Sequence, residues 1–263
     1  MSTTPDVPYR LEFSVEVPGT PEQVWHAIAT ARGMSAWFTP TQLEEHVGGS
    51  LHFDMGADMG ADGHVVAWEP PYRLVYAEDW AALMGTDPGS LSPLTSEFVV
   101  EARSGGTCVV HVTSSGFGIG ADWEQGFWDE MAPGWMPHFD TLRLYLAHFA
   151  GQDATHWEAQ ASHPGSPEAL WSTVRDALGI SAESTQADVR GHRGTVEKLG
   201  DRHALLRVEA PVPGMLTLAT YKERGDRATV AARGFLFSPE ATEVAPRERQ
   251  AWESWLADLP VRA

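Results

Sequence analysis

Glu78 is the residue whose type and spacing best fit acid–base chemistry. A strand expected at 72–80 carries alternating residues that share one face: Leu74, Tyr76, Glu78 and Trp80. If that face points into an aromatic interior, the loss of water raises the pKa of the Glu78 carboxyl group. If the strand ends in solvent, Glu78 is an ordinary surface carboxylate. Glu78 is therefore the best candidate for a catalytic residue.

The histidines and the single cysteine give no comparable site. His111 alternates with Cys108, Val110 and Val112, so its side chain should point away from theirs towards solvent, which makes it a poor general base. The other histidines of the first half show no i, i+4 pairing of the kind that assembles a metal site. No P-loop, dinucleotide fingerprint or Gly-x-Ser-x-Gly motif is present. We therefore expect no metal and no cofactor.

Many aromatic residues accompany Glu78 in the first half of the chain. Such residues can line a concave binding site, or they can simply fill a core. A helix expected at 137–150 has an apolar stripe that could form the opposite wall. The candidate ligand-binding residues are Trp68, Tyr76, Glu78, Trp80, Phe98 and Phe117 from the strands and Phe139, Leu142 and Leu146 from the helix. The best candidates for a cavity mouth lie beside charged residues, namely Trp80, Trp123 and Trp128.

The chain also contains an internal repeat. Residues 10–25 and 155–171 both run from an alternating strand through Pro-Gly and Ser/Thr-Pro-Glu to an apolar residue and a tryptophan. Trp25 and Trp171 lie 171 − 25 = 146 positions apart. Weaker matches further along the chain are separated by fewer positions than this. The falling offset indicates one architecture used twice, with shorter connections in the second copy. Proteins built of hairpins can also resemble one another by chance, and only the opening match is specific.

Apolar periodicity and turn signals predict an α+β fold in each copy. Residues 1–151 should contain strands at 9–17, 50–55, 63–69, 72–80, 95–103 and 106–115, and helices from Pro21 to about Thr30 and at 137–150. Residues 116–134 should form a loop, or a short helix around Trp123–Met131. Residues 152–263 should contain strands at 155–162, 192–199, 203–210, 214–223 and 227–237, and helices at 167–178 and 246–258. The boundary is expected at 151–153.

Composition and charge exclude several kinds of partner. Apolar residues make up 43% of the chain, and no apolar run approaches the ~20 residues that span a bilayer. Residues 1–151 hold 20 acidic residues against five arginines and no lysine, which gives −15 of the total net charge of −18. This field repels nucleic acid and anionic membranes but could attract a cationic ligand. Residues 1–8 lack the features of a secretory signal, so we expect a cytoplasmic protein.

The first half resembles the SRPBCC superfamily, and within it the branch similar to the activator of the heat-shock-protein-ninety ATPase. The segments that carry this resemblance over roughly residues 8–151 include Pro21–Trp25, Trp37-Phe38, Gly49–Leu51, Trp68–Val75, Gly116–Gly118 and Gly134–Pro137. The resemblance implies a helix-grip fold, in which a curved antiparallel sheet wraps a long C-terminal helix around an apolar cavity. Residues 152–263 look like a shortened, divergent second copy. The fold alone does not fix an activity.

Three functions remain open on the sequence alone. The first is binding of a hydrophobic or aromatic small molecule inside the first domain, as in carrier, sequestration or self-resistance proteins. The second is an enzyme similar to polyketide cyclases and aromatases, a lyase or dehydratase that uses the same cavity. The third is a protein-interaction module of the co-chaperone kind. An inner cavity would favour the first two, and a filled core with an exposed apolar patch would favour the third.

Overall fold

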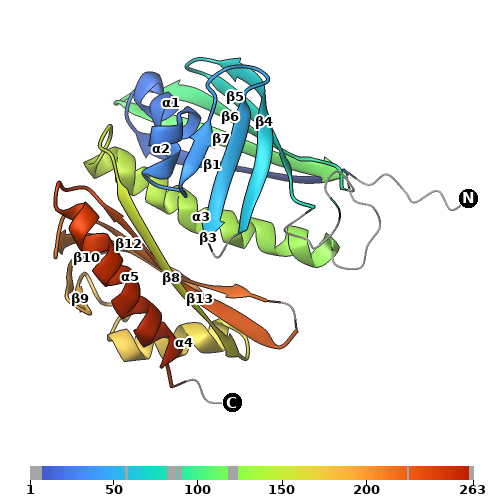
Figure 1. Cartoon of the computed structure of the whole chain (residues 1–263). Coiled ribbons are helices and arrows are strands. Elements are labelled where there is room, and N and C mark those ends of the chain that lie inside the picture. Colours follow the sequence, from blue (N-terminus) through green and yellow to red (C-terminus); the bar gives the residue numbers. More distant parts are fainter. Residues whose placement is uncertain are drawn as a thin grey trace, which may run out of the picture. The chain divides into compact units, whose positions relative to one another are not determined.

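The computed structural model describes residues 8–56, 59–81, 87, 91–117, 124–223 and 225–260. The chain divides into two compact units, Met1–Gly151 and Gln152–Ala263 (Figure 1). None of the described helices is both long enough and apolar enough to cross a membrane.

The first unit is an antiparallel sheet with a long helix on one face. Its elements are β1 (Pro8–Pro18), α1 (Pro21–Ala29), α2 (Ala31–Ser35), β2 (Thr41–Leu43), β3 (Ser50–Gly56), β4 (Met59–Glu69), β5 (Arg73–Asp79), β6 (Leu94–Arg103), β7 (Thr107–Phe117) and α3 (Glu124–His148). Within the described residues the strands form a seven-stranded sheet in the order β1-β7-β6-β5-β4-β3-β2. Helix α3 runs along one face, where the Phe139 ring lies 4.8 Å from that of Phe13 (Figure 1).

The second unit follows the same path with fewer elements. It contains β8 (Thr155–Pro164), α4 (Pro167–Leu178), β9 (Gln186–Val189), β10 (His192–Leu199), β11 (His203–Ala210), β12 (Gly214–Lys222), β13 (Arg227–Leu236) and α5 (Ala241–Ala257). Its described strands pair in the order β8-β13-β12-β11-β10-β9. In both units the first strand therefore pairs with the last, and the remaining strands follow as successive hairpins. This confirms the prediction of an α+β helix-grip fold in two copies.

The repeated opening motif has the same structural role in both units. Gly19 and Gly165 have φ values of 118° and 104°, a conformation that favours glycine. The next residues, Thr20 and Ser166, cap α1 and α4 through their side-chain oxygens, and a proline occupies the first turn of each helix. The glycine, the capping side chain and the proline therefore end a strand and start a helix through local interactions. Because these interactions need particular residue types, the motif can be recognised in both halves of the sequence.

The structure differs from the sequence prediction at short strands and at two helix starts. β2 and β9 were not predicted, because three or four residues are too few to show an alternation. The long helices begin at Glu124 and Ala241, not at 137 and 246, so those predicted starts were wrong. Prolines at 133, 137 and 246 suggested the later starts, since proline removes a backbone hydrogen bond inside a helix. In α5, burial of Ala241 and Ala245 helps to offset this cost.

Candidate functional site

The sheet face covered by α3 is apolar where Phe139 packs on it. Cross-strand partners place Leu74 beside Phe98, Phe98 beside Val112, and Val112 beside Phe13. The Phe139 ring lies 4.8 Å from the ring of Phe13 and 6.4 Å from that of Phe98. This row forms an ordinary hydrophobic core between the sheet and the helix.

The next row of the same face is polar, although it is equally buried. Tyr76 on β5 pairs with Ser96 on β6, which pairs with Ser114 on β7. The two serine hydroxyls lie 3.2 Å apart, and the Tyr76 hydroxyl also bonds to Ser96. All three residues are at most 1% exposed. The sequence analysis missed both serines, although Ser96 stands between Leu94 and Phe98 on an otherwise apolar face.

Glu78 lies one step beyond this row on β5 and is only 1% exposed. One carboxylate oxygen, Oε1, accepts a hydrogen bond of 3.2 Å from the Trp80 indole, while Oε2 has no partner among the described residues. Burial raises the pKa of Glu78 to about 8, and the bond from Trp80 opposes the shift. Burial, followed by the charge of Glu78, also raises the pKa of Tyr76 well above its ordinary value. Such a carboxyl group can exchange a proton near neutral pH or anchor a ligand.

The structure places the other candidate binding residues in three situations. Tyr76, Phe98, Phe139 and Leu142 are at most 1% exposed and Leu146 is 7% exposed. Trp68 and Trp80 are half-buried, and Trp68 packs edge-on against Trp25 with ring centroids 5.1 Å apart. The side chain of Phe117 and the whole of Trp123 lie outside the described residues. Trp128, a candidate for the mouth, stacks on Tyr9 at 5.2 Å.

The most deeply buried of these residues pack against one another. The ring of Phe98 lies 5.7 Å from that of Tyr76 and 6.4 Å from that of Phe139.

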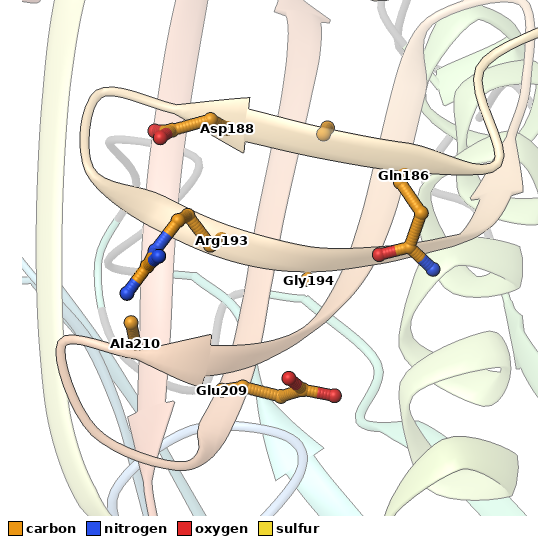
Figure 2. Close-up of a pocket in the computed structure, with 7 residues that line it drawn as sticks. Gln186, Asp188, Arg193, Gly194, Glu209 and Ala210 are labelled. Carbon is orange, nitrogen blue, oxygen red and sulfur yellow. The ribbon is translucent and has the colours of Figure 1, made fainter.

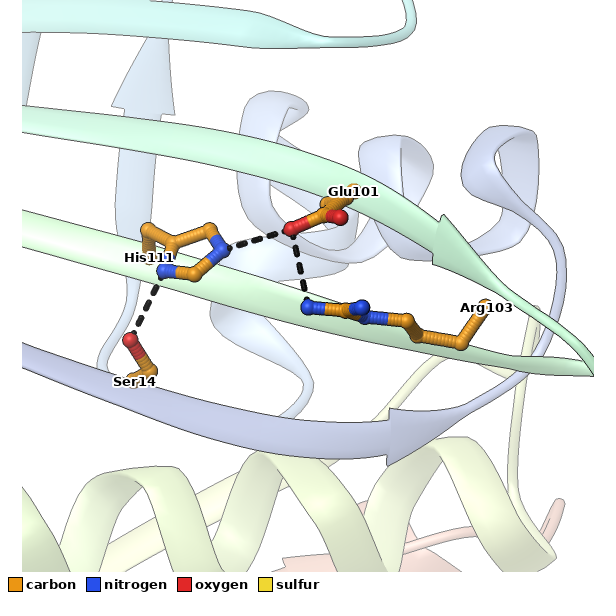
Figure 3. Close-up of polar contacts among 4 residues, drawn as sticks. All are labelled: Ser14, Glu101, Arg103 and His111. Carbon is orange, nitrogen blue, oxygen red and sulfur yellow. Dashed lines mark hydrogen bonds and ion pairs between the residues drawn. The ribbon is translucent and has the colours of Figure 1, made fainter.

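His111 lies on the opposite, outer face of the first sheet, as its alternation predicts. Its Nδ1 is 2.8 Å from Ser14 Oγ and its Nε2 is 3.0 Å from Glu101 Oε2, and Arg103 also bonds to Glu101 (Figure 3). A serine, a histidine and a carboxylate in series resemble a nucleophilic triad. Ser14, His111 and Glu101 lie at paired positions within strands, and the side chains of His111 and Glu101 are 43% and 48% exposed. We interpret these contacts as hydrogen bonds and ion pairs among surface side chains, without a catalytic role.

The second unit carries a shallow groove on β9, β10 and β11. Its volume is about 610 Å³, and it is lined by Gln186, Ala187, Asp188, Arg193, Gly194, Glu209 and Ala210 (Figure 2). The lining is polar and open, with acidic and basic groups exposed side by side. No aromatic wall and no buried titratable group is present among these lining residues, so the groove offers little to fix the orientation of a ligand.

A cluster of aromatic side chains fills part of the second core. The guanidinium of Arg190 lies 5.4 Å and 5.0 Å from the ring centroids of Trp252 and Trp255. His192 is 1% exposed, and its Nε2 lies 3.3 Å from Glu248 Oε2. Burial lowers the pKa of His192, although Glu248 opposes the shift. The guanidinium of Arg190 packs on these rings, so the cluster holds the β9–β10 turn against α5.

Comparison with known families agrees with the fold and with the extent of the first unit. Residues 18–147 match the family described as Activator of Hsp90 ATPase homolog 1-like protein. The first unit belongs to this family. It thereby belongs to the branch of the SRPBCC superfamily that the sequence motifs indicated. No curated protein sequence matches the chain. No group of three or more His, Cys, Asp or Glu side chains that could hold a metal occurs in the described residues.

Several solved structures are similar to one or both units. A protein from Mesorhizobium loti is 20% identical with a TM-score of 0.47, over 54% of this chain and 98% of its own. DynU16, from the dynemicin biosynthetic locus, is 16% identical with a TM-score of 0.44, over 96% and 97% of the two chains. The di-domain ARO/CYC protein BexL, from the BE-7585A biosynthetic pathway, is 11% identical with a TM-score of 0.44, over 97% and 99%.

Proposed function

We propose that the first unit binds a hydrophobic or aromatic small molecule between its sheet and α3, beside Glu78. The observation that carries the proposal is Oε2 of a carboxyl group that is 1% exposed, an atom with no hydrogen-bond partner among the described residues. Burying such an atom costs about 1–3 kcal/mol or more, and a cost of this kind is usually retained for a function. Aromatic side chains around it, such as Tyr76 and Phe98, would stack on a flat ligand.

Thermal unfolding of the full chain in the presence of flat aromatic and aliphatic compounds tests this proposal. A ligand that binds only the folded state raises the melting temperature, and the rise grows with the logarithm of its concentration above Kd. Leu142→Trp adds bulk at a fully buried position of α3 and should reduce the shift. If that variant does not fold, Ser96→Val serves instead, since it removes a hydroxyl from the polar row. Equal shifts in parent and variant would place the compounds elsewhere and contradict the proposal.

A second candidate function is supported by the pKa of Glu78, which burial raises to about 8. A group that titrates near neutral pH can act as a general acid or base, as a cyclase or aromatase would require. Incubation with a poly-β-ketone analogue, followed by mass spectrometry, tests this function. Loss of one water in the parent but not in Glu78→Gln would support it, and unchanged substrate in both would exclude it for that substrate class.

A third candidate is a co-chaperone-like interaction module, and the burial of Phe98, Phe139 and Leu142 in one core is compatible with it. This function needs no internal ligand. It becomes the better account if no small molecule shifts the melting temperature of the chain.

A further inference from the structure

We propose that the ligand of the first unit carries a protonated amine on a flat aromatic body, and that this amine pairs with the carboxylate of Glu78. The inference rests on the proposed function and names the chemical class of its ligand. It follows from three observations: the partners of Glu78, the positions of the arginines, and the charge of the unit.

Glu78 has an open position for a hydrogen-bond donor. Trp80 Nε1 donates to Oε1 at 3.2 Å, and Oε2 has no hydrogen-bond partner among the described residues. The titratable group that interacts with this carboxylate is Tyr76, which supplies no positive charge. A buried carboxylate is stable when it is both paired with a cation and hydrogen-bonded, and Glu78 has only a single hydrogen bond.

No lysine or arginine of the first unit supplies this charge. Residues 1–151 contain no lysine and five arginines. Arg10 and Arg103 pair with Glu12 and Glu101 on exposed strand positions, and Arg73 pairs with two other glutamates. The remaining two act elsewhere, because Arg32 donates to the carbonyl of Gly151 and Arg143 is exposed beside Asp140. A cationic partner for the ionised form of Glu78 would therefore not be an arginine or a lysine of this unit.

The surroundings favour an amine on an aromatic body over a small inorganic cation. The rings of Tyr76 and Phe98 lie 5.7 Å apart beside the polar row and give this part of the unit an aromatic character. Ser96 and Ser114 add hydroxyl groups to the same buried face of the sheet. The net charge of −15 on residues 1–151 would attract a cation from solution.

Calorimetric titration of the full chain with 2-naphthylmethylamine and with 2-naphthylmethanol tests the inference, since the two compounds differ mainly in charge. We expect the amine to bind at least about tenfold more tightly than the alcohol. In buffers of different ionisation enthalpy, amine binding near pH 7 should release a proton. Burial keeps Glu78 mostly protonated without a ligand, with a pKa of about 8, and the ammonium ionises it. The alcohol should release none.

Two variants locate the effect. Glu78→Gln keeps the shape of the side chain and should abolish both the amine preference and the proton release. Glu101→Gln removes a carboxylate from the outer face and should behave as the parent. Equal affinity for the two compounds, or an amine preference that survives Glu78→Gln, overturns the inference and leaves the proposed function standing.

A neutral carbonyl compound provides the remaining comparison. If 2-acetonaphthone binds more tightly than the amine, Glu78 acts as a protonated hydrogen-bond donor and the inference is overturned. If none of the three compounds binds the parent, the proposed function falls, and this inference falls with it.

Discussion

At the scale of single residues, the buried carboxyl group of Glu78 should make folding of the first unit depend on pH. Its pKa is about 8 in the folded unit, against an ordinary value of 4.5. Between these values the folded state keeps a proton that the unfolded chain has lost. Stability that is fully present below the unfolded pKa is therefore lost as the pH rises towards 8. The loss is at most about 5 kcal/mol, since one pKa unit corresponds to ~1.4 kcal/mol.

Glu78→Gln should remove this dependence, because the amide does not ionise. Chemical denaturation from about pH 5 to about pH 8 should show the wild type losing stability relative to the variant, with the variant the more stable at the upper end. Glu101→Gln, which changes an exposed carboxylate, is the matched control and should keep the wild-type slope. A Gln variant that is less stable than the wild type near pH 8 would show that Glu78 is not a desolvated carboxyl group.

His192 should make the second unit sensitive to acid. Burial lowers its pKa below the ordinary 6.5, and Arg190 lowers it further, while Glu248, the Val189 carbonyl and Asp188 oppose the shift. Stability is present above the unfolded pKa and is lost as the pH falls, because the unfolded chain takes up the proton first. In His192→Gln the loss of unfolding free energy below about pH 6.5 should be smaller than in the wild type. Identical acid profiles would contradict this expectation.

At the scale of elements, two glycines stand at matching places in the two sheets. A Cβ on Gly63 of β4 would lie 2.4 Å from the Ala77 carbonyl oxygen, and one on Gly194 of β10 would lie 2.0 Å from that of Arg207. Both contacts are with backbone atoms, which cannot give way easily. The close approach of neighbouring strands explains why the repeat keeps glycine at both positions.

Alanine at either glycine should therefore be strongly destabilising, by about 2–4 kcal/mol. The matched control is Gly126→Ala in α3, where a Cβ would meet nothing within 4 Å. It should stabilise the helix by about 0.5–1 kcal/mol. Thermal melting of Gly63→Ala, Gly194→Ala and Gly126→Ala compares the three. A Gly194→Ala chain that melts like the wild type would contradict the close approach seen between β10 and β11.

The elements that could be predicted from sequence are those that local chemistry defines. The capping residues Thr20 and Ser166 indicate where α1 and α4 start. The alternation of apolar residues in β5 places Tyr76 and Glu78 on one face of the sheet. The pair of Ser96 and Ser114 could not be predicted, because it depends on the register between β6 and β7. A short helix around Trp123–Met131 was one of two alternatives, but its continuity with the helix at 137–150 was not predicted, because the prolines suggest a break.

At the scale of the whole molecule, the charge should affect ligand binding over a distance. The chain carries a net charge of −18, of which residues 1–151 hold −15. Salt shortens the reach of this field to about 10 Å at 0.1 M ionic strength. Affinity for 2-naphthylmethylamine should therefore fall as salt rises, mainly through slower association, while affinity for 2-naphthylmethanol should not fall. Stopped-flow fluorescence measures both, and a parallel loss for the two compounds would contradict an electrostatic origin.

The most direct measurement is a structure of the full chain with 2-naphthylmethylamine bound. The account predicts the naphthyl group between the sheet and α3 of the first unit, with the ammonium nitrogen within hydrogen-bond distance of the Glu78 carboxylate. A compound bound in the groove of the second unit, or held in the first unit with its amine turned away from Glu78, would contradict it.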